Sequence, residues 1–214
     1  HSAMTTRKMI DHIVIGAASL DLTATIEQQF GTAFGGGGKH PIMATHNRLL
    51  KLQHDLYCEV IAVDPEAAAT RPRWFSLDAP QTEIKLRAGP RPLCWVWGVP
   101  DIDHAVTVCG YDPGRIITMT RDDLQWRLTV ADDGVLAENG ILPILIEWPG
   151  GRNPAHRMAD SSVRLSRLVL THPNPAMIAN CLDRLGARNA VVLASGVPAI
   201  AFHFDTPNGP VVLA

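Results

Sequence analysis

Hydrophobic residues along this chain gather in short runs that return in a fixed order. Three runs rich in β-branched or aromatic side chains lie at residues 11–16, 94–99 and 167–172, and each predicts a strand. Turn residues follow each run, and then apolar residues at helical spacing lead to a glycine that can end a helix. The order strand, helix, strand, strand, strand can be traced three times, with the last copy abbreviated. A repeated supersecondary unit indicates a fold more strongly than any single motif does.

The first unit has recognisable helix boundaries. Ser19 or Asp21 can cap its helix, and Gly31 can end it. Its later strands are expected at residues 45–52 and 56–63, where apolar and β-branched residues dominate. These features predict one complete βαβββ unit.

The second and third units are joined to the first by less regular segments. A connector rich in Pro and Ala spans residues 64–80, and its Trp74 and Phe75 are expected to dock on a core. Later strands of the second unit are expected at residues 115–119, 124–130 and 141–148. Pro143 weakens the last of these and favours an edge or a bulge there. The third unit begins at Arg164, and Pro175 fits the first position of its helix.

Composition limits the classes of partner. The chain has 214 residues, of which 46% are hydrophobic and 19% charged, as in ordinary soluble globular proteins. With a net charge of −2 and scattered basic residues, we expect no nucleic-acid or membrane partner. The four cysteines form no CxxC motif, which favours a reducing, cytoplasmic location. The N-terminus lacks the pattern of a secretion signal, and residues 1–3 are set aside as an expression remnant.

Three side chains are candidates for chemistry. His12 lies between apolar neighbours on the first strand, and Glu59 and Glu147 each interrupt an apolar strand. Burying such a carboxylate is costly unless it is paired or bound to a cation. The alternatives are an edge strand with its glutamate in water, or a salt bridge to Arg121 or Arg127. A lone strand histidine is also more often structural than a ligand.

The ordered set of strands resembles the vicinal oxygen chelate superfamily, and specifically its glyoxalase-like domain proteins. The stretches that carry this resemblance span nearly the whole chain; they are residues 11–14, 38–47, 57–62, 124–128, 143–148 and 205–211. In such proteins two βαβββ units pair, and their curved sheets enclose a cup. The resemblance implies an α+β fold, with curved mixed sheets of repeated βαβββ units like those of glyoxalase and bleomycin-resistance proteins, and a third abbreviated unit.

The resemblance also implies a metal site. The family holds a metal with one residue from the first strand and one from the last strand of each unit, which here gives His12, Glu59, Cys94 and Glu147. Cys94 departs from the usual ligands and is expected to pack instead. His12, Glu59 and Glu147 suit a divalent Mn, Fe, Ni, Co or Zn ion. The pair of histidines and one carboxylate found in ferrous oxygenases cannot be assembled at these positions.

Further polar residues are expected at the substrate. His40, Thr45 and Asn47 lie around a glycine-rich turn that faces the pocket in the resembled family, although turn formation explains them equally well. Arg121, Trp126 and Arg127 lie on adjoining strands, where an arginine can pair with a carboxylate and a tryptophan can form an apolar wall. Solvated arginines and a core tryptophan are the alternative. The four glycines do not make a phosphate-binding loop, because the residue types around them are wrong.

These observations predict a metal-assisted lyase or isomerase that acts on a small carbonyl compound, with Glu59 or Glu147 as the base. The alternative is a metal-free protein of the bleomycin-resistance type that binds and sequesters a small molecule. We expect a paired glyoxalase-like domain at residues 9–150 and an abbreviated unit packed on it at residues 163–214. A homodimer is possible.

Overall fold

The computed structural model describes residues 8–214, so the expected remnant at residues 1–3 lies outside it. One curved sheet holds β1 (Met9–Gly16), β2 (Lys39–His40), β3 (Thr45–Lys51), β4 (Tyr57–Val63), β5 (Arg91–Gly98), β6 (Arg115–Arg121), β7 (Leu124–Val130) and β8 (Ile144–Glu147). A second sheet holds β9 (Arg164–His172), β10 (Val192–Ser195), β11 (Ala199–Thr206) and β12 (Gly209–Leu213). The α-helices are α1 (Thr23–Phe30), α2 (Pro80–Arg87), α3 (Ile102–Val108) and α4 (Pro175–Leu185). Short 3-10 helices are η1 (Leu20–Leu22), η2 (Ala137–Gly140), η3 (Pro154–Arg157) and η4 (Arg188–Ala190).

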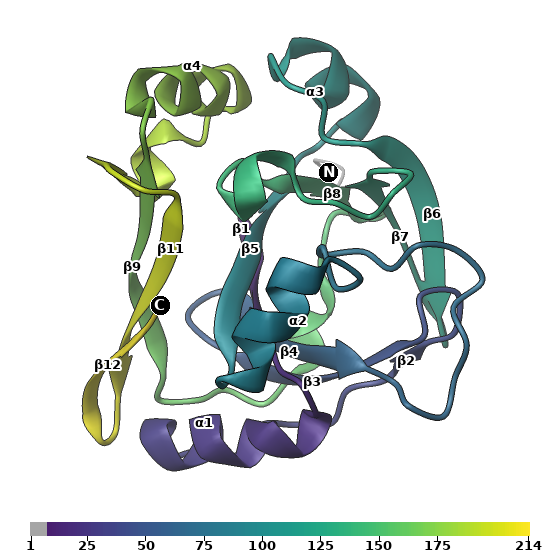
Figure 1. Ribbon diagram of the computed structural model, residues 1–214, viewed down its shortest axis with the longest axis vertical. Coiled ribbons are helices and arrows are strands. Elements are labelled where there is room, and N and C mark those ends of the chain that lie inside the picture. The colour runs from purple at the N-terminus through teal and green to yellow at the C-terminus, as the bar shows by residue number, and fades with distance from the viewer. Residues whose placement is uncertain (1–7) are drawn as a thin grey trace.

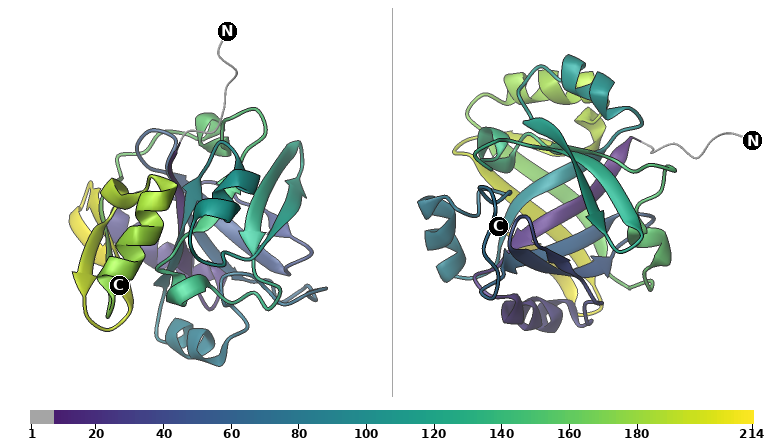
Figure 2. Two further views of the ribbon diagram at one scale, coloured as in Figure 1. Left: turned by 90° about the horizontal axis from the view of Figure 1, so that it is seen from above. Right: turned by 90° about the vertical axis from the view of Figure 1, so that its right-hand side faces the viewer.

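The large sheet is built from two equivalent halves. Its strand order is β2-β3-β4-β1-β5-β8-β7-β6. In each half the first strand runs parallel to the last, β1 beside β4 and β5 beside β8, and the halves join through the antiparallel pair β1 and β5. The two outer wings curve toward each other, which gives the cup seen in Figure 2. The predicted α+β class with curved mixed sheets of βαβββ units is confirmed.

Local signals in the sequence explain the ends of the helices. The side chain of Ser19 accepts a hydrogen bond at the start of η1, and Gly31 ends α1 in the left-handed conformation. Asn174 caps α4 by accepting from the Met177 backbone, and Gly186 ends that helix in the same left-handed way. Both predicted boundaries of α4 and the predicted end of α1 are therefore confirmed, whereas Ser19 caps η1 and α1 itself begins later, at Thr23.

The third unit repeats the order of elements but not their topology. Its strand order is β10-β9-β11-β12, and β10 lies directly beside β9 in parallel. In the first two units the parallel neighbour of the opening strand is instead the last strand. This sheet stands beside β1 and β5 in Figure 1, and one hydrophobic core joins its Phe202 and Leu170 to Ile13 and Trp95 of the large sheet. The third unit therefore covers the outer face of the cup.

Two expectations about the second unit need correction. The strand expected at residues 141–148 begins only at Ile144, and it lies between β5 and β7 instead of at an edge. Pro143 lies just before β8, outside its hydrogen-bonded ladder, and its carbonyl accepts a hydrogen bond from the Tyr111 hydroxyl. Helix α2 was not expected; it begins where the expected connector at residues 64–80 ends. Trp74 and Phe75 of that connector are buried, as predicted. Among residues 8–214, no helix has the length and apolar character needed to cross a bilayer.

Candidate functional site

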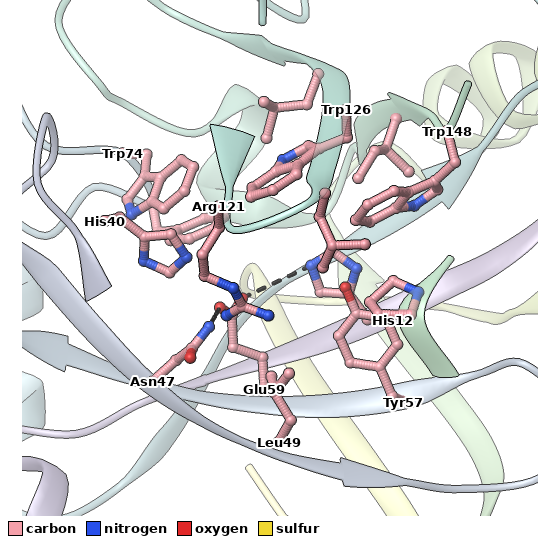
Figure 3. A pocket seen from close by; sticks show the side chains of 15 residues that line it. His12, His40, Asn47, Leu49, Tyr57, Glu59, Trp74, Arg121, Trp126 and Trp148 are labelled. Carbon is pink, nitrogen blue, oxygen red and sulfur yellow. Dashed lines mark hydrogen bonds and ion pairs between the residues drawn. The ribbon is translucent and has the colours of Figure 1, made fainter. Parts of the chain in front are cut away.

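A narrow cavity opens inside the cup, between the wings of the two halves (Figure 3). Its volume is about 40 Å³, a few times the space that one water molecule needs, so only a small ligand or the end of a larger one fits. The polar lining residues are His12, His40, Asn47, Tyr57, Glu59 and Arg121. The aromatic and aliphatic lining residues are Leu49, Trp74, Phe75, Leu124, Trp126, Leu128, Ile146, Trp148 and Pro154. The first half of the sheet supplies most of the polar side chains, and the second half supplies mainly apolar walls.

A bulge in β1 places two adjacent side chains on one network. The pairing of β1 with β5 shifts register between Ile10 and His12, so Asp11 has no partner in that ladder. Its carboxylate lies 2.6 Å from Nδ1 of His12 and also accepts hydrogen bonds from the Trp148 indole and the Asn153 amide. A carboxylate can only accept, so Nδ1 of His12 is the donor. Nε2 is therefore left to face the cavity.

Glu59 meets this histidine from β4. Its Oε1 lies 3.6 Å from His12 Nε2, and its Oε2 accepts a hydrogen bond of 2.6 Å from the Asn47 amide. Asn47 is oriented in turn, because its carbonyl oxygen accepts from the Gly38 backbone. The ring of His12 stacks on Tyr57 with centroids 4.6 Å apart. The imidazole and the carboxylate are thus held face to face by residues on both sides.

His40 is a neutral member of the lining. Burial lowers its pKa to about 4, although the negative charge of Glu59 acts in the opposite direction. One ring nitrogen lies 3.2 Å from the Thr45 hydroxyl, which also accepts a hydrogen bond from the Trp74 indole. Burial also raises the pKa of the Tyr57 phenol, with Asp11 and Glu59 adding to the effect. At neutral pH both groups are uncharged.

Arg121 reaches over the cavity from the end of β6. Figure 3 shows its side chain directed between Asn47 and His12, above Glu59. The residue that makes room for it is Gly38, because a Cβ at that position would lie 2.7 Å from the Arg121 side chain. Gly37 is needed for a different reason, since a Cβ there would lie 1.8 Å from the backbone oxygen of Asn47. The glycine-rich turn therefore shapes the site by close approach of its backbone.

The donor atoms in the cup do not fit the metal that the family resemblance implies. A catalytic metal is usually held by three protein ligands. Within residues 8–214, no three side chains of His, Cys, Asp or Glu come together in a way that could hold an ion. His12 and Glu59 face each other, but the second half brings Ile146 to the cavity instead of a third donor. His40 also lines the cavity, but it does not join His12 and Glu59 in a group that could hold an ion, so only two donors face each other.

Glu147 is not brought to this cavity. It belongs to the opposite face of β8, since side chains alternate along a strand and Ile146 and Trp148 line the cup. Its carboxylate accepts a hydrogen bond of 2.8 Å from the Ile102 backbone at the start of α3. There it stabilises the positive end of the helix. The expected set of His12, Glu59 and Glu147 is therefore not assembled.

The other expected residues divide in the same way. His40, Asn47, Arg121 and Trp126 line the cavity. Arg127 lies outside it and pairs with Asp103 through two hydrogen bonds, which raise the pKa of the guanidinium.

Thr45 and Cys94 support the cavity without lining it. Thr45 is fully buried behind the His40 ring and the Trp74 indole. Cys94 packs in the apolar core at the closed end of the cup, as expected, and burial raises the pKa of its thiol well above the usual value. Neither side chain is in position to contact a ligand.

Several contributors were not singled out from the sequence. Asp11 directly precedes His12, and strict alternation would have sent the two side chains to opposite faces; only the bulge unites them. Trp148 shares a strand face with Ile144 and Ile146, but that strand is apolar on both faces, so its pattern gives no orientation. For Trp74 the sequence offered one signal: a large aromatic side chain in a connector is expected to pack against the rest of the protein.

A second cavity of about 370 Å³ adjoins the first. It lies between the glycine-rich segment at residues 35–36 and the segment at residues 157–161. Leu49 lines both cavities, and its side chain packs with Tyr57 and Met158 between them. The two spaces are neighbours separated by an apolar partition.

Comparison with solved structures finds resemblances of low identity. A methylmalonyl-CoA epimerase from Streptomyces coelicolor, in complex with 2-nitronate-propionyl-CoA, is 17% identical with a TM-score of 0.45, over 70% of this chain and 99% of that one. The methylmalonyl-CoA epimerase from Mycobacterium tuberculosis is 16% identical with a TM-score of 0.43, over 74% and 96% of the two chains. A hypothetical protein from Bacillus halodurans is 13% identical with a TM-score of 0.43, over 66% and 93%. These identities and TM-scores are too low to assign a substrate to this chain.

A comparison with curated proteins finds no match. The sequence pattern of one family, described as a glyoxalase-like domain, matches residues 10–186. That stretch covers both halves of the large sheet and continues through β9 and α4. It confirms the resemblance drawn from the strands and their order. The chain therefore belongs to the glyoxalase-like domain family.

Proposed function

We propose that this protein is an acid–base enzyme, an isomerase or lyase that moves a proton next to the carbonyl group of a small molecule. The observation that carries the proposal is the 3.6 Å approach of Glu59 Oε1 to His12 Nε2 inside an aromatic-walled cavity. Each partner is held by a further residue, Asp11 behind the imidazole and Asn47 behind the carboxylate. Buried titratable pairs of this kind are typical of sites that transfer protons.

The two groups have complementary parts in such a reaction. Glu59 takes the proton from the carbon next to the carbonyl. His12 presents Nε2 from the other side, where it can deliver a proton to the oxygen on which negative charge develops. Asp11 keeps the ring in the orientation that this needs. His40 is neutral at pH 7 and can hydrogen-bond the substrate without adding charge.

Exchange of substrate hydrogen for solvent deuterium tests the proposal directly. The protein is incubated in D₂O with small ketones and 2-oxo acids, and loss of the α-proton signal is followed by NMR. We expect exchange that Glu59→Gln slows by about 100-fold or more, because general-base catalysis contributes about that factor. The same exchange is expected after dialysis against a chelator, since two protein donors do not make a resident metal site.

The matched control is Glu147→Gln, which removes the same charge from the outer face of the sheet. This variant is expected to keep the exchange rate, because Glu147 binds the start of α3 and not the cavity. Equal rates for wild type and Glu59→Gln would contradict the proposal. So would an exchange rate that disappears with chelation and returns with added metal.

The alternative function is sequestration of an aromatic or apolar molecule without turnover. It is favoured by the aromatic walls of the cavity, which include Trp74, Phe75, Trp126 and Trp148. In that case ligands would quench tryptophan fluorescence saturably, and Glu59→Gln would bind them as wild type does. Absence of exchange with every compound that binds would favour this alternative over the enzyme.

A further inference from the structure

The hairpin formed by β6 and β7 carries three arginines in different states. Arg115 and Arg127 each make two hydrogen bonds of 2.9–3.1 Å to an aspartate, Asp132 and Asp103 respectively. Arg121 makes no hydrogen bond or ion pair with any residue in the range 8–214. It is also the only one of the three that lines the cavity.

The surroundings of Arg121 make this lack of a partner significant. The side chain is half-buried, lies across Gly38 and enters a cavity with tryptophan walls. An unpaired charge in such a place is unfavourable unless an anion joins it. Glu59 does not supply that anion, because its oxygens face Asn47 and His12 and no ion pair joins it to Arg121.

We propose that the substrate is a small monocarboxylate and that Arg121 binds its carboxylate group. This inference rests on the function proposed above and adds the substrate class. A guanidinium presents two parallel N–H donors that match a carboxylate. A single charge fits better than a phosphate dianion, because the Glu59 carboxyl group lines the same cavity and the cavity offers no second arginine or lysine. The substrate's carbonyl end then lies toward Glu59 and His12.

The five tryptophans provide an internal reporter for binding. Trp74, Trp126 and Trp148 line the cavity. The indoles of Trp95 and Trp97 donate elsewhere in the core, to the carbonyls of Ile141 and Leu185. In a ¹H–¹⁵N spectrum of the full-length protein, a ligand in the cavity should move the first three indole signals and leave the other two unchanged.

The probes are propionate and propionamide, which have nearly the same shape and differ in charge. We expect propionate to shift the cavity indole signals saturably, with a Kd of about 1 mM, as suits so small a ligand. Propionamide at equal concentrations is expected to leave them unchanged. Arg121→Met should weaken propionate binding by about tenfold or more. Arg121→Lys should weaken it by less, because lysine keeps the positive charge but lacks the two parallel N–H donors of arginine.

Arg127→Met is the matched control, because it removes an arginine from the same hairpin outside the cavity. It should bind propionate as wild type does, while unchanged Trp95 and Trp97 signals report an intact fold. Equal binding of acid and amide, no saturable shift with propionate, or full binding by Arg121→Met would each overturn the inference. Because this experiment measures binding alone, deuterium exchange that persists after such a result would leave the acid–base enzyme standing with another substrate class.

Discussion

His40 and Glu59 show how burial sets the state of a single side chain. The buried carboxyl group of Glu59 has a partner at each oxygen, because the Asn47 amide donates to one and His12 faces the other. His40 has no charged partner in contact and is held neutral by loss of hydration, which brings its pKa to about 4. Because this pKa of His40 lies well below its usual value, the stability of the protein depends on pH.

The pKa of His40 predicts a loss of stability in mild acid. Its value is lowered from 6.5 to about 4, so between these pH values the unfolded chain binds a proton that the folded chain does not. The free energy of unfolding should therefore be highest above pH 6.5 and fall by at most about 3 kcal/mol as the pH drops toward 4. Urea unfolding between pH 4 and 7.5 measures this.

His40→Gln should flatten that part of the profile, whereas His104→Gln, at an exposed position on α3, should not. A profile for His40→Gln as steep as that of wild type would contradict the assignment. Because other groups also titrate in this range, the difference between the two profiles is the quantity to compare.

Single residues also mark the limit of what the sequence could predict. Glu59 and His12 were found because a polar residue in a buried strand needs a partner. Glu147 was wrongly placed with them, because β8 is buried on both faces and an apolar strand of this kind has no pattern that distinguishes inside from outside. Asp11 was missed because a bulge breaks the alternation on which such an argument depends.

At the level of elements, the glycine-rich segment and β3 act together. Glycines at residues 35–38 allow the chain to pass close to β3, where the Leu49 carbonyl accepts a hydrogen bond from Gly35 and the Asn47 side chain one from Gly38. Apart from α2 and the short strand β2, the helices and strands were predictable, because caps, terminal glycines and apolar runs are local signals. The topology of the third unit was not, since the order of elements leaves open which strands pair.

The glycine segment gives a matched pair of substitutions. Gly37→Ala should destabilise the protein by about 1–3 kcal/mol, because the new Cβ would lie 1.8 Å from the Asn47 backbone oxygen. Gly36→Ala should change stability by less than about 0.5 kcal/mol, because no atom lies within 4 Å of its Cβ position. Denaturant unfolding measures both, and equal effects would show that Gly37 does not approach Asn47 so closely.

At the scale of the whole molecule, the small sheet completes the core of the large one. Phe204 packs against Phe30 of α1 with ring centroids 4.7 Å apart. Gln53, in the turn between β3 and β4, both donates to and accepts from the backbone of Leu165. The division proposed from the sequence, residues 9–150 and 163–214, would therefore separate two parts that share one apolar interior.

A chain ending at residue 162 should consequently lose its cooperative fold. Removing the second sheet would expose Ile13 and Trp95, which are now fully buried. We expect broad thermal unfolding and binding of a hydrophobic dye, as in states that keep secondary structure without fixed packing. The full-length protein in the same buffer is the control. A sharp melting transition in the shortened chain would contradict this expectation.

The partition at Leu49 bears on how the protein could be altered to accept other molecules. In the present structure the cavity beside Glu59 has room only for a short compound, and Leu49 separates it from the larger cavity. Trimming that one aliphatic side chain to alanine would open a passage between them. Under the function and substrate class proposed above, longer-chain acids would then fit with their tails in the far compartment, and selectivity for chain length would depend on a residue that takes no part in the chemistry.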